Sequence, residues 1–296
     1  MRFAFATLNV FAAAAFALAQ PQARTIKKIN PDVNSIPGVE SWSNVLPSTP
    51  AEPKTNAKRF AMKLPPLAPR AHHYPQRAAP HRLGTRVQAA PRTQASPQPP
   101  INLNCNILMT SRSQNYGYLS PNFNEFGEYG LFQPDRAGAL EVLFSYSRSS
   151  PNQLDGTVGN SPTAAFPYLG ASVGFASNDS SLGPGDPDYL FVVGTTQTPP
   201  GSPPVAGANS FSVATGAGSV EYESAIWTLE LETLYITAEW VNPDGVVPKT
   251  SYVYADDENQ ALVITGDAEA FRENFDVKYP DVKLACAPIP DHPSRH

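Results

Sequence analysis

Hydrophobic and polar residues alternate most clearly over residues 224–245, SAIWTLELETLYITAEWVNPDG. Two runs of period-two alternation follow each other, and this pattern predicts a β-hairpin. The apolar positions are odd-numbered in the first run and even-numbered in the second. Any register in which paired residue numbers sum to an odd value therefore puts both apolar sets on one face, with Trp227 and Trp240 toward the core. The turn lacks the Gly or Asn that would define its type, so the register itself stays open.

Similar short runs recur from residue 101 onward, separated by turns rich in Gly, Pro, Asn and Asp. One short helix is predicted over 268–275, with Asp267 as its N-cap and with Phe271 and Phe275 on its buried side. About nine short strands and one helix predict an all-β domain over residues 101–290, an antiparallel sandwich or barrel-like domain. The predicted strands outside the hairpin are 101–110, 115–120, 138–147, 168–176, 188–196, 251–254, 261–266 and 281–289.

The composition changes near residue 100. Residues 20–100 are rich in Pro and Arg and have no sustained periodicity, so we expect a disordered basic arm or a propeptide. They carry 12 Lys and Arg against 3 Asp and Glu, whereas residues 101–296 carry 8 against 23. The net charge of −5 therefore conceals a basic arm on an acidic body. An acidic body is a poor partner for nucleic acid, and none is expected.

The first residues have the features of a secretory signal peptide over residues 1–19. Arg2 precedes an apolar run that ends in Ala17-Leu18-Ala19. The alternative is a membrane anchor, which needs about 20 apolar residues, and Asn9 interrupts this run. We therefore expect a secreted protein that has no membrane association after cleavage, with a polar tail over 291–296.

The arm and the body each contain a candidate modification site. Lys58-Arg59 in the arm is a candidate site for a processing protease, the alternative being a solvated pair of charges. Asn178 begins the only glycosylation sequon of the body and lies in a loop rich in Ser, Gly and Pro.

Two cysteines, Cys105 and Cys286, lie near the two ends of the acidic body. In a secreted chain an even number of cysteines indicates a disulfide, and this one would join the first and last strands. The alternative is two unpaired buried thiols.

The distribution of histidine limits the chemistry of the body. All five histidines lie outside residues 101–290, so a Ser-His-Asp or Cys-His nucleophile system has no base there. The usual zinc site lacks ligands for the same reason, and no cofactor or metal is expected.

Carboxylates provide the remaining candidate chemistry. Glu221 with Glu223 and Asp186 with Asp188 are spaced to face one side of a strand, as two glycosidase acids could. The alternative is that these acids are solvated on the surface. The acidic loop Asp256–Asn259 offers oxygen ligands for calcium, but it lacks the ligand spacing of a calcium-binding loop, which favours a charged turn.

Six aromatic residues lie within the turn-rich segment 115–132, next to Asn and Glu. Aromatic rings beside such groups suit the stacking of sugars, and the alternative is that they plug one end of the domain. The candidate binding residues are Tyr116, Tyr118, Phe126 and Tyr129. The uncharged segment 194–218 is predicted to be a long loop and is the second place where a site is expected.

The segments NCNILMTSRSQNYGYLSPNFNEFGEYG, PYLGASVGFAS, GTTQTPPGSPPVAGANSFSVATG, ESAIWTL and AEWVNPDG follow one another in the body, and AKRFAMKLPPLAPR precedes it. In this combination the chain resembles an uncharacterised family of secreted proteins from mushroom-forming (basidiomycete) fungi. The resemblance covers about residues 56–286. It implies fungal origin and secretion and supplies no activity, ligand or catalytic residue.

These features favour a secreted, extracellular or cell-wall-associated protein. The simplest role is a non-catalytic module that binds carbohydrate, with cell-wall polysaccharide or another glycan as its partner. Two alternatives stay open: a carboxylate-dependent, glycosidase-like hydrolase, and a structural surface-coating protein whose association depends on the basic arm.

Overall fold

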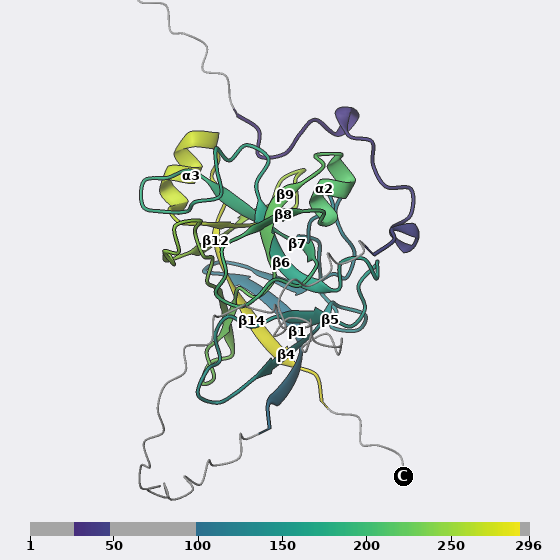
Figure 1. Ribbon diagram of the computed structural model, residues 1–296, viewed down its shortest axis with the longest axis vertical. Helices are drawn as coiled ribbons and strands as arrows, with labels where there is room; N and C mark the ends of the chain where they lie inside the picture. The colour runs from purple at the N-terminus through teal and green to yellow at the C-terminus, as the bar shows by residue number, and fades with distance from the viewer. Residues whose placement is uncertain (1–26, 48–98, 291–296) are drawn as a thin grey trace, which may run out of the picture.

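The computed structural model describes residues 27–47 and 99–290 (Figure 1). The predicted signal peptide, the Lys58-Arg59 site and the tail over 291–296 lie outside these residues. Within them the chain is mostly β-structure, as its pattern predicts. No helix of this part of the chain is long and apolar enough to cross a membrane.

Eight antiparallel strands close into a barrel. In order around the barrel they are β14 (Asp281–Pro288), β12 (Ser251–Ala255), β13 (Ala261–Thr265), β7 (Tyr189–Thr195), β6 (Tyr168–Val173), β5 (Gly156–Val158), β4 (Glu141–Tyr146) and β1 (Ile101–Ser111). Pairing of β1 with β14 closes the circle. The all-β prediction is confirmed, and the architecture is a barrel with further strands.

Six further strands branch from this barrel: β2 (Asn115–Leu119), β3 (Phe132–Gln133), β8 (Val205–Gly207), β9 (Val220–Glu223), β10 (Trp227–Leu229) and β11 (Tyr235–Ala238). They attach through β2 to β1, through β9 to β6 and through β11 to β14. Each of these barrel strands uses part of one edge for its barrel neighbour and another part for the branch. The branch strands therefore pair with backbone N–H and C=O groups that the short barrel strands leave unpaired.

The hairpin of β10 and β11 has the parity that the sequence requires. Trp227 pairs with Ala238 and Leu229 with Ile236, so the paired numbers sum to an odd value. Trp227 and Trp240 are buried, and the indole Nε1 of Trp227 donates to the carbonyl of Leu169 at 2.7 Å. Both tryptophans therefore belong to the core.

The helix α3 (Ala268–Phe275) has the bounds and the cap that were predicted. Asp267 Oδ1 accepts from the backbone N–H groups of Glu269 and Ala270, and Phe271 and Phe275 are buried.

The prediction of a single helix was wrong, because the segment 194–218 contains a second one, α2 (Ser210–Thr215), after the short strand β8. Asn209 and Ser212 form a capping box at its start, and Phe211 is buried. Six uncharged residues are too few to show helical periodicity, so the cap and the burial of Phe211 decide this helix.

Strand β7 is buried on both faces. Leu190 and Val192 point into the barrel core, whereas Tyr189, Phe191 and Val193 belong to a second apolar cluster on the outside. We call the second cluster the outer cluster; α2 and α3 cover it, as Figure 1 shows beside β7 and β12. Its members are Ile29, Phe126, Tyr189, Phe191, Val193, Phe211, Val253, Ala255, Ala261, Val263, Phe271, Phe275 and Tyr279.

Residues 27–47, which we call the strap, complete this cover (purple in Figure 1). The strap contains two 3-10 turns, η1 (Val33–Ser35) and η2 (Trp42–Asn44). Ile29 is only 3% exposed, and the Trp42 ring packs on Phe123 with centroids 4.7 Å apart. The sequence predicts a disordered basic arm or a propeptide over residues 20–100, and this part of it packs on the body. Isolated apolar residues have no periodicity that would reveal such packing, which depends on the surface they contact.

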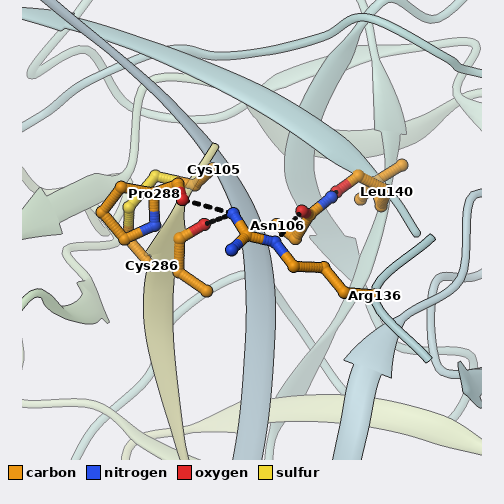
Figure 2. Close-up of a disulfide and its surroundings, with 7 residues drawn as sticks. Cys105, Asn106, Arg136, Leu140, Cys286 and Pro288 are labelled. Atoms are coloured by element: carbon orange, nitrogen blue, oxygen red, sulfur yellow. Dashed lines mark hydrogen bonds between the residues drawn. A yellow bond between two sulfur atoms is a disulfide. The ribbon is translucent and has the colours of Figure 1, made fainter. Parts of the chain in front are cut away.

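The predicted disulfide between Cys105 and Cys286 is present and links β1 to β14. Figure 2 shows a second link beside it, made by the Arg136 guanidinium. Arg136 Nε donates to Asn106 Oδ1 at 2.8 Å, and Nη2 donates to the carbonyl of Ala287 at 2.9 Å. The closing strand pair is thus held by backbone, side-chain and covalent bonds together.

Removing the disulfide should strongly destabilise the barrel. The bond spans 181 residues, and the chain-entropy model gives a loss of about 5 kcal/mol for a loop of this length. We expect the double variant Cys105→Ser with Cys286→Ser to lose about this much unfolding free energy, measured by urea denaturation. Wild-type protein in reductant should show a similar loss, which separates the bond from the side chains. An unchanged unfolding free energy in both samples would contradict the assignment.

Candidate functional site

A polar groove of about 690 Å³ lies between the strap, the loop 123–131 and the loop 256–260. The first loop connects β2 to β3, and the second connects β12 to β13. The groove thus joins the two segments in which the sequence placed exposed aromatics and a cluster of oxygen ligands. The two loops line it mainly with amides and carboxylates: Asn124, Glu125, Asp257, Glu258, Asn259 and Gln260.

The two loops are fixed in close contact. A Cβ atom on Gly130 would collide with the backbone carbonyl of Gln260, so only glycine allows this approach. Tyr254 Oη donates to the carbonyl of Gly130 at 3.0 Å. Asn124 Nδ2 donates to the carbonyl of Asn259 at 2.9 Å. The two walls that these loops form are therefore set before any ligand arrives.

Glu128 lies beneath the groove and is completely buried. Its backbone forms a bridge with Val193 of β7, and its N–H donates to Asn124 Oδ1 at 2.9 Å. Its carboxyl Oε2 accepts from Asn124 Nδ2 at 2.8 Å and from Asn30 Nδ2 at 3.3 Å. Burial raises the pKa of the carboxyl to about 8, and the two amide donors oppose this only in part. Glu128 is therefore mostly a neutral acid at pH 7.

Asn30 of the strap connects Glu128 to the groove. Its Nδ2 also lies 3.4 Å from Asn259 Oδ1 as a donor. Asn259 Nδ2 donates to Asp257 Oδ1 at 2.8 Å, and the Tyr279 hydroxyl donates to Asp257 Oδ2. A continuous polar network thus runs from a buried acid to an exposed carboxylate.

Two atoms of this network have no hydrogen-bond partner among residues 27–47 and 99–290. They are Glu128 Oε1 and Asn30 Oδ1, and both are buried. An unpaired buried polar atom costs on the order of 1–3 kcal/mol. The contact between strap and body is therefore incomplete at its polar centre.

The four candidate aromatic residues do not form one exposed surface. Tyr129 is fully buried in the barrel core and Phe126 is 4% exposed in the outer cluster. Tyr116 and Tyr118 lie half-buried on β2, and the ring of Tyr116 packs edge-on against Tyr254 at 5.0 Å. Phe126 is the only one of the four that lines the groove. A spacing of three residues in a turn does not define which side of the loop each ring occupies.

The predicted carboxylate pairs lie away from the groove. Asp188 is buried and Oδ1 accepts from the backbone N–H and the Nδ2 of Asn178, at 2.8 and 3.0 Å. This acid holds the loop that carries the sequon. Asn178 itself is exposed, and its glycosylation stays a prediction.

Glu223 of the other pair is also buried, and its Oε1 accepts from the backbone N–H of Val241 at 3.2 Å. Burial raises its pKa to about 8. Its neighbour Glu221 is half-buried on the same strand. Both acids thus belong to the packing of β9.

The chemistry of the groove is that of hydrogen bonding. Amides donate and accept, and the exposed carboxylate of Asp257 accepts. Across the part of the chain that the structure describes, no group of three or more His, Cys, Asp or Glu side chains is arranged to hold a metal ion. Glu128 and Asn30 could not be identified from the sequence, because residue type does not distinguish a buried acid or amide from an exposed one.

Fold and groove together define a disulfide-linked antiparallel β-barrel with a polar groove along an N-terminal strap. Comparisons with protein-family models, with curated proteins and with solved structures found no match to this chain. The functional interpretation therefore rests on the geometry.

The pH dependence of stability should reveal Glu128. Its pKa is raised from 4.5 to about 8, so between these values the folded protein keeps a proton that the unfolded chain loses. The stabilisation that comes from this bound proton is complete below pH 4.5 and is lost as the pH rises toward 8. We expect the unfolding free energy to fall over this interval in urea titrations, and to fall less in Glu128→Gln.

Two further variants serve as comparisons for this measurement. Glu223→Gln should remove a similar share of the pH dependence, because that carboxyl is also buried and its pKa is also raised to about 8. Glu125→Gln, at an exposed position of the same loop as Glu128, is the control for loss of a carboxyl group from this loop. An identical slope in wild type and Glu128→Gln would show that Glu128 ionises normally.

Proposed function

We propose that the protein is a secreted, non-catalytic module that binds carbohydrate, such as cell-wall polysaccharide, in the polar groove. The observation that carries this proposal is the fixed array of Asp257, Asn259 and Tyr279 on the groove wall. Sugar hydroxyls both donate and accept, and planar amide and carboxylate groups can bind two neighbouring hydroxyls at once. A volume of about 690 Å³ lies within the range of small-ligand sites.

The array is held in place without a ligand. Asp257 Oδ1 accepts from both the N–H and the Nδ2 of Asn259, at 2.9 and 2.8 Å. Asp257 and Gln260 remain exposed and can reach a ligand. Groups that are already oriented lose little conformational entropy on binding, which favours affinity.

Aromatic rings lie next to the same acidic loop and support the proposal. Tyr116, Phe132 and Tyr254 pack edge-on or tilted against one another. Burial and then the charge of Asp256 raise the pKa of Tyr116, which places this ring near the loop. Tyr116 and Phe132 are half-buried, and rings of this kind offer an apolar face to a sugar that extends beyond the groove.

Binding is favoured over hydrolysis by the position of the acids. A glycosidase needs a proton donor that touches the glycosidic oxygen. Glu128 has the raised pKa of such a donor, but it is completely buried beneath Asn30. Secretion is supported by the features of residues 1–19 and by the disulfide, which persists in oxidising compartments.

Substitutions at the array test this function. We expect Asp257→Ala and Asn259→Ala to bind soluble oligosaccharides of chitin, β-glucan, mannan or xylan about tenfold more weakly, because each removes a hydrogen-bonding group worth about 1.4 kcal/mol. Binding would be measured by calorimetry on the full chain and by retention on the insoluble polysaccharides.

Asp244→Ala is the matched control. Asp244 is also exposed, and its Oδ1 accepts from the N–H two residues later at 2.9 Å, as Asp257 does, but on a different loop. It should bind like wild type. If the wild-type protein binds none of these polysaccharides, or if Asp257→Ala and Asn259→Ala bind as wild type does, the groove is not a carbohydrate site.

A further inference from the structure

Two consecutive strap residues fill two neighbouring positions on the body. Ile29 is buried in the outer cluster, and its carbonyl accepts from the Tyr189 hydroxyl at 2.5 Å. Asn30 covers Glu128 and reaches Asn259 on the groove wall. The strap is thus anchored by an apolar residue and closes the polar centre of the groove with the residue that follows.

The Ile29 anchor is well packed, whereas the Asn30 contact leaves polar atoms unpaired. Ile29 fits its surroundings completely, since it is 3% exposed among aromatic rings. The contact of Asn30 leaves its own Oδ1 and Glu128 Oε1 buried without partners within the described residues. The Lys28 ammonium near this contact lies 3.9 Å from Asp32, which belongs to the strap itself. Asn30 is therefore a poor match for the group that it covers.

We propose that the strap is a displaceable occupant of the carbohydrate site, with the Asn30 amide standing where a hydroxyl of the bound glycan would lie. This inference rests on the proposed function. The Asn30 Nδ2 donates to Glu128 Oε2 and to Asn259 Oδ1, and a sugar hydroxyl at the same place would donate its one proton to one of these two acceptors. A hydroxyl can also accept, and so it can pair with a protonated Glu128, which the amide Nδ2 cannot.

Displacement makes glycan binding and strap docking compete for one surface. A ligand that binds only the open groove shifts the population toward the released strap, and release raises the apparent affinity for that ligand. By linkage, the factor by which the strap weakens ligand binding equals the factor by which the ligand weakens strap docking. The full chain would therefore bind glycan more weakly than its groove permits.

Two variants uncover Glu128 by different routes. Ile29→Asp places a charge in the outer cluster and should detach the strap, whereas Asn30→Ala keeps the anchor and removes only the amide over Glu128. Leu46→Asp is the matched control, because it adds the same charge to the same strap at a position that is 83% exposed. Far-UV circular dichroism would verify that each variant retains the β-barrel.

Trp42 reports the position of the strap without any ligand. It is the only tryptophan outside the body, and its ring packs on Phe123, whereas Trp227 and Trp240 are buried in the core. We expect Ile29→Asp to shift Trp42 emission to longer wavelength, and Leu46→Asp to leave it unchanged. Adding an oligosaccharide that binds to the wild-type chain should shift Trp42 emission to longer wavelength as well.

Affinity for soluble oligosaccharides of chitin, β-glucan, mannan and xylan then decides the question. We expect Ile29→Asp and Asn30→Ala to bind about tenfold more tightly than wild type and Leu46→Asp. Equal affinity in all four proteins would overturn the displaceable strap and leave the carbohydrate function intact. Weaker binding by both variants would overturn it too, and would make the strap a wall of the site. If no protein binds, the proposed function fails and the inference fails with it.

Discussion

Pairing of the first barrel strand with the last is the constraint on which the rest of the structure depends. Seven residue pairs join β1 to β14, and the disulfide and the Arg136 bonds lie at the same place. Closure removes the open edges that a β-sheet would otherwise expose. It also assembles the groove, because β2 and β3 branch from β1 whereas β12 and β13 follow β14 on its other side. The two loops that meet at Gly130 and Gln260 therefore come from opposite sides of the closing pair.

The outer cluster is the second consequence of the barrel. Strands β7, β12 and β13 carry apolar residues on both faces, so their outward face must be covered. The helices α2 and α3 cover part of it, and the strap contributes Ile29. A segment that is distant in sequence thus becomes part of the packing of the body. The cover is least complete at its polar edge, where Asn30 meets Glu128.

Glu128 departs from the usual rule that a buried polar atom is hydrogen-bonded. It is a buried acid with a raised pKa and one unpartnered oxygen, next to an amide that also lacks a partner. Natural sequences keep such departures mostly where function requires them. The acid lies between two loops that are rich in hydrogen-bonding groups and below the strap. Its position links the proposed carbohydrate groove to the strap that we propose to be displaceable.

The sequence alone determined the local features whose signal is periodic or chemical. The alternation over residues 224–245 determined the face of Trp227 and Trp240, the cap and phenylalanine spacing determined α3, and the pair of cysteines determined the disulfide. Each of these depends on neighbours in sequence or on a bond that only one residue type makes.

The tertiary structure decided what depends on contacts between distant segments. It made the sheet a closed barrel, packed residues 27–47 against the body, and formed α2 in a segment without periodicity. It also buried Phe126 and Tyr129, for which the sequence left open a sugar-binding surface or a plug at one end of the domain, and it placed Glu128 beneath Asn30, 98 residues away. Burial and pairing across such separations are properties of the packed surface, and no local pattern of residues encodes them.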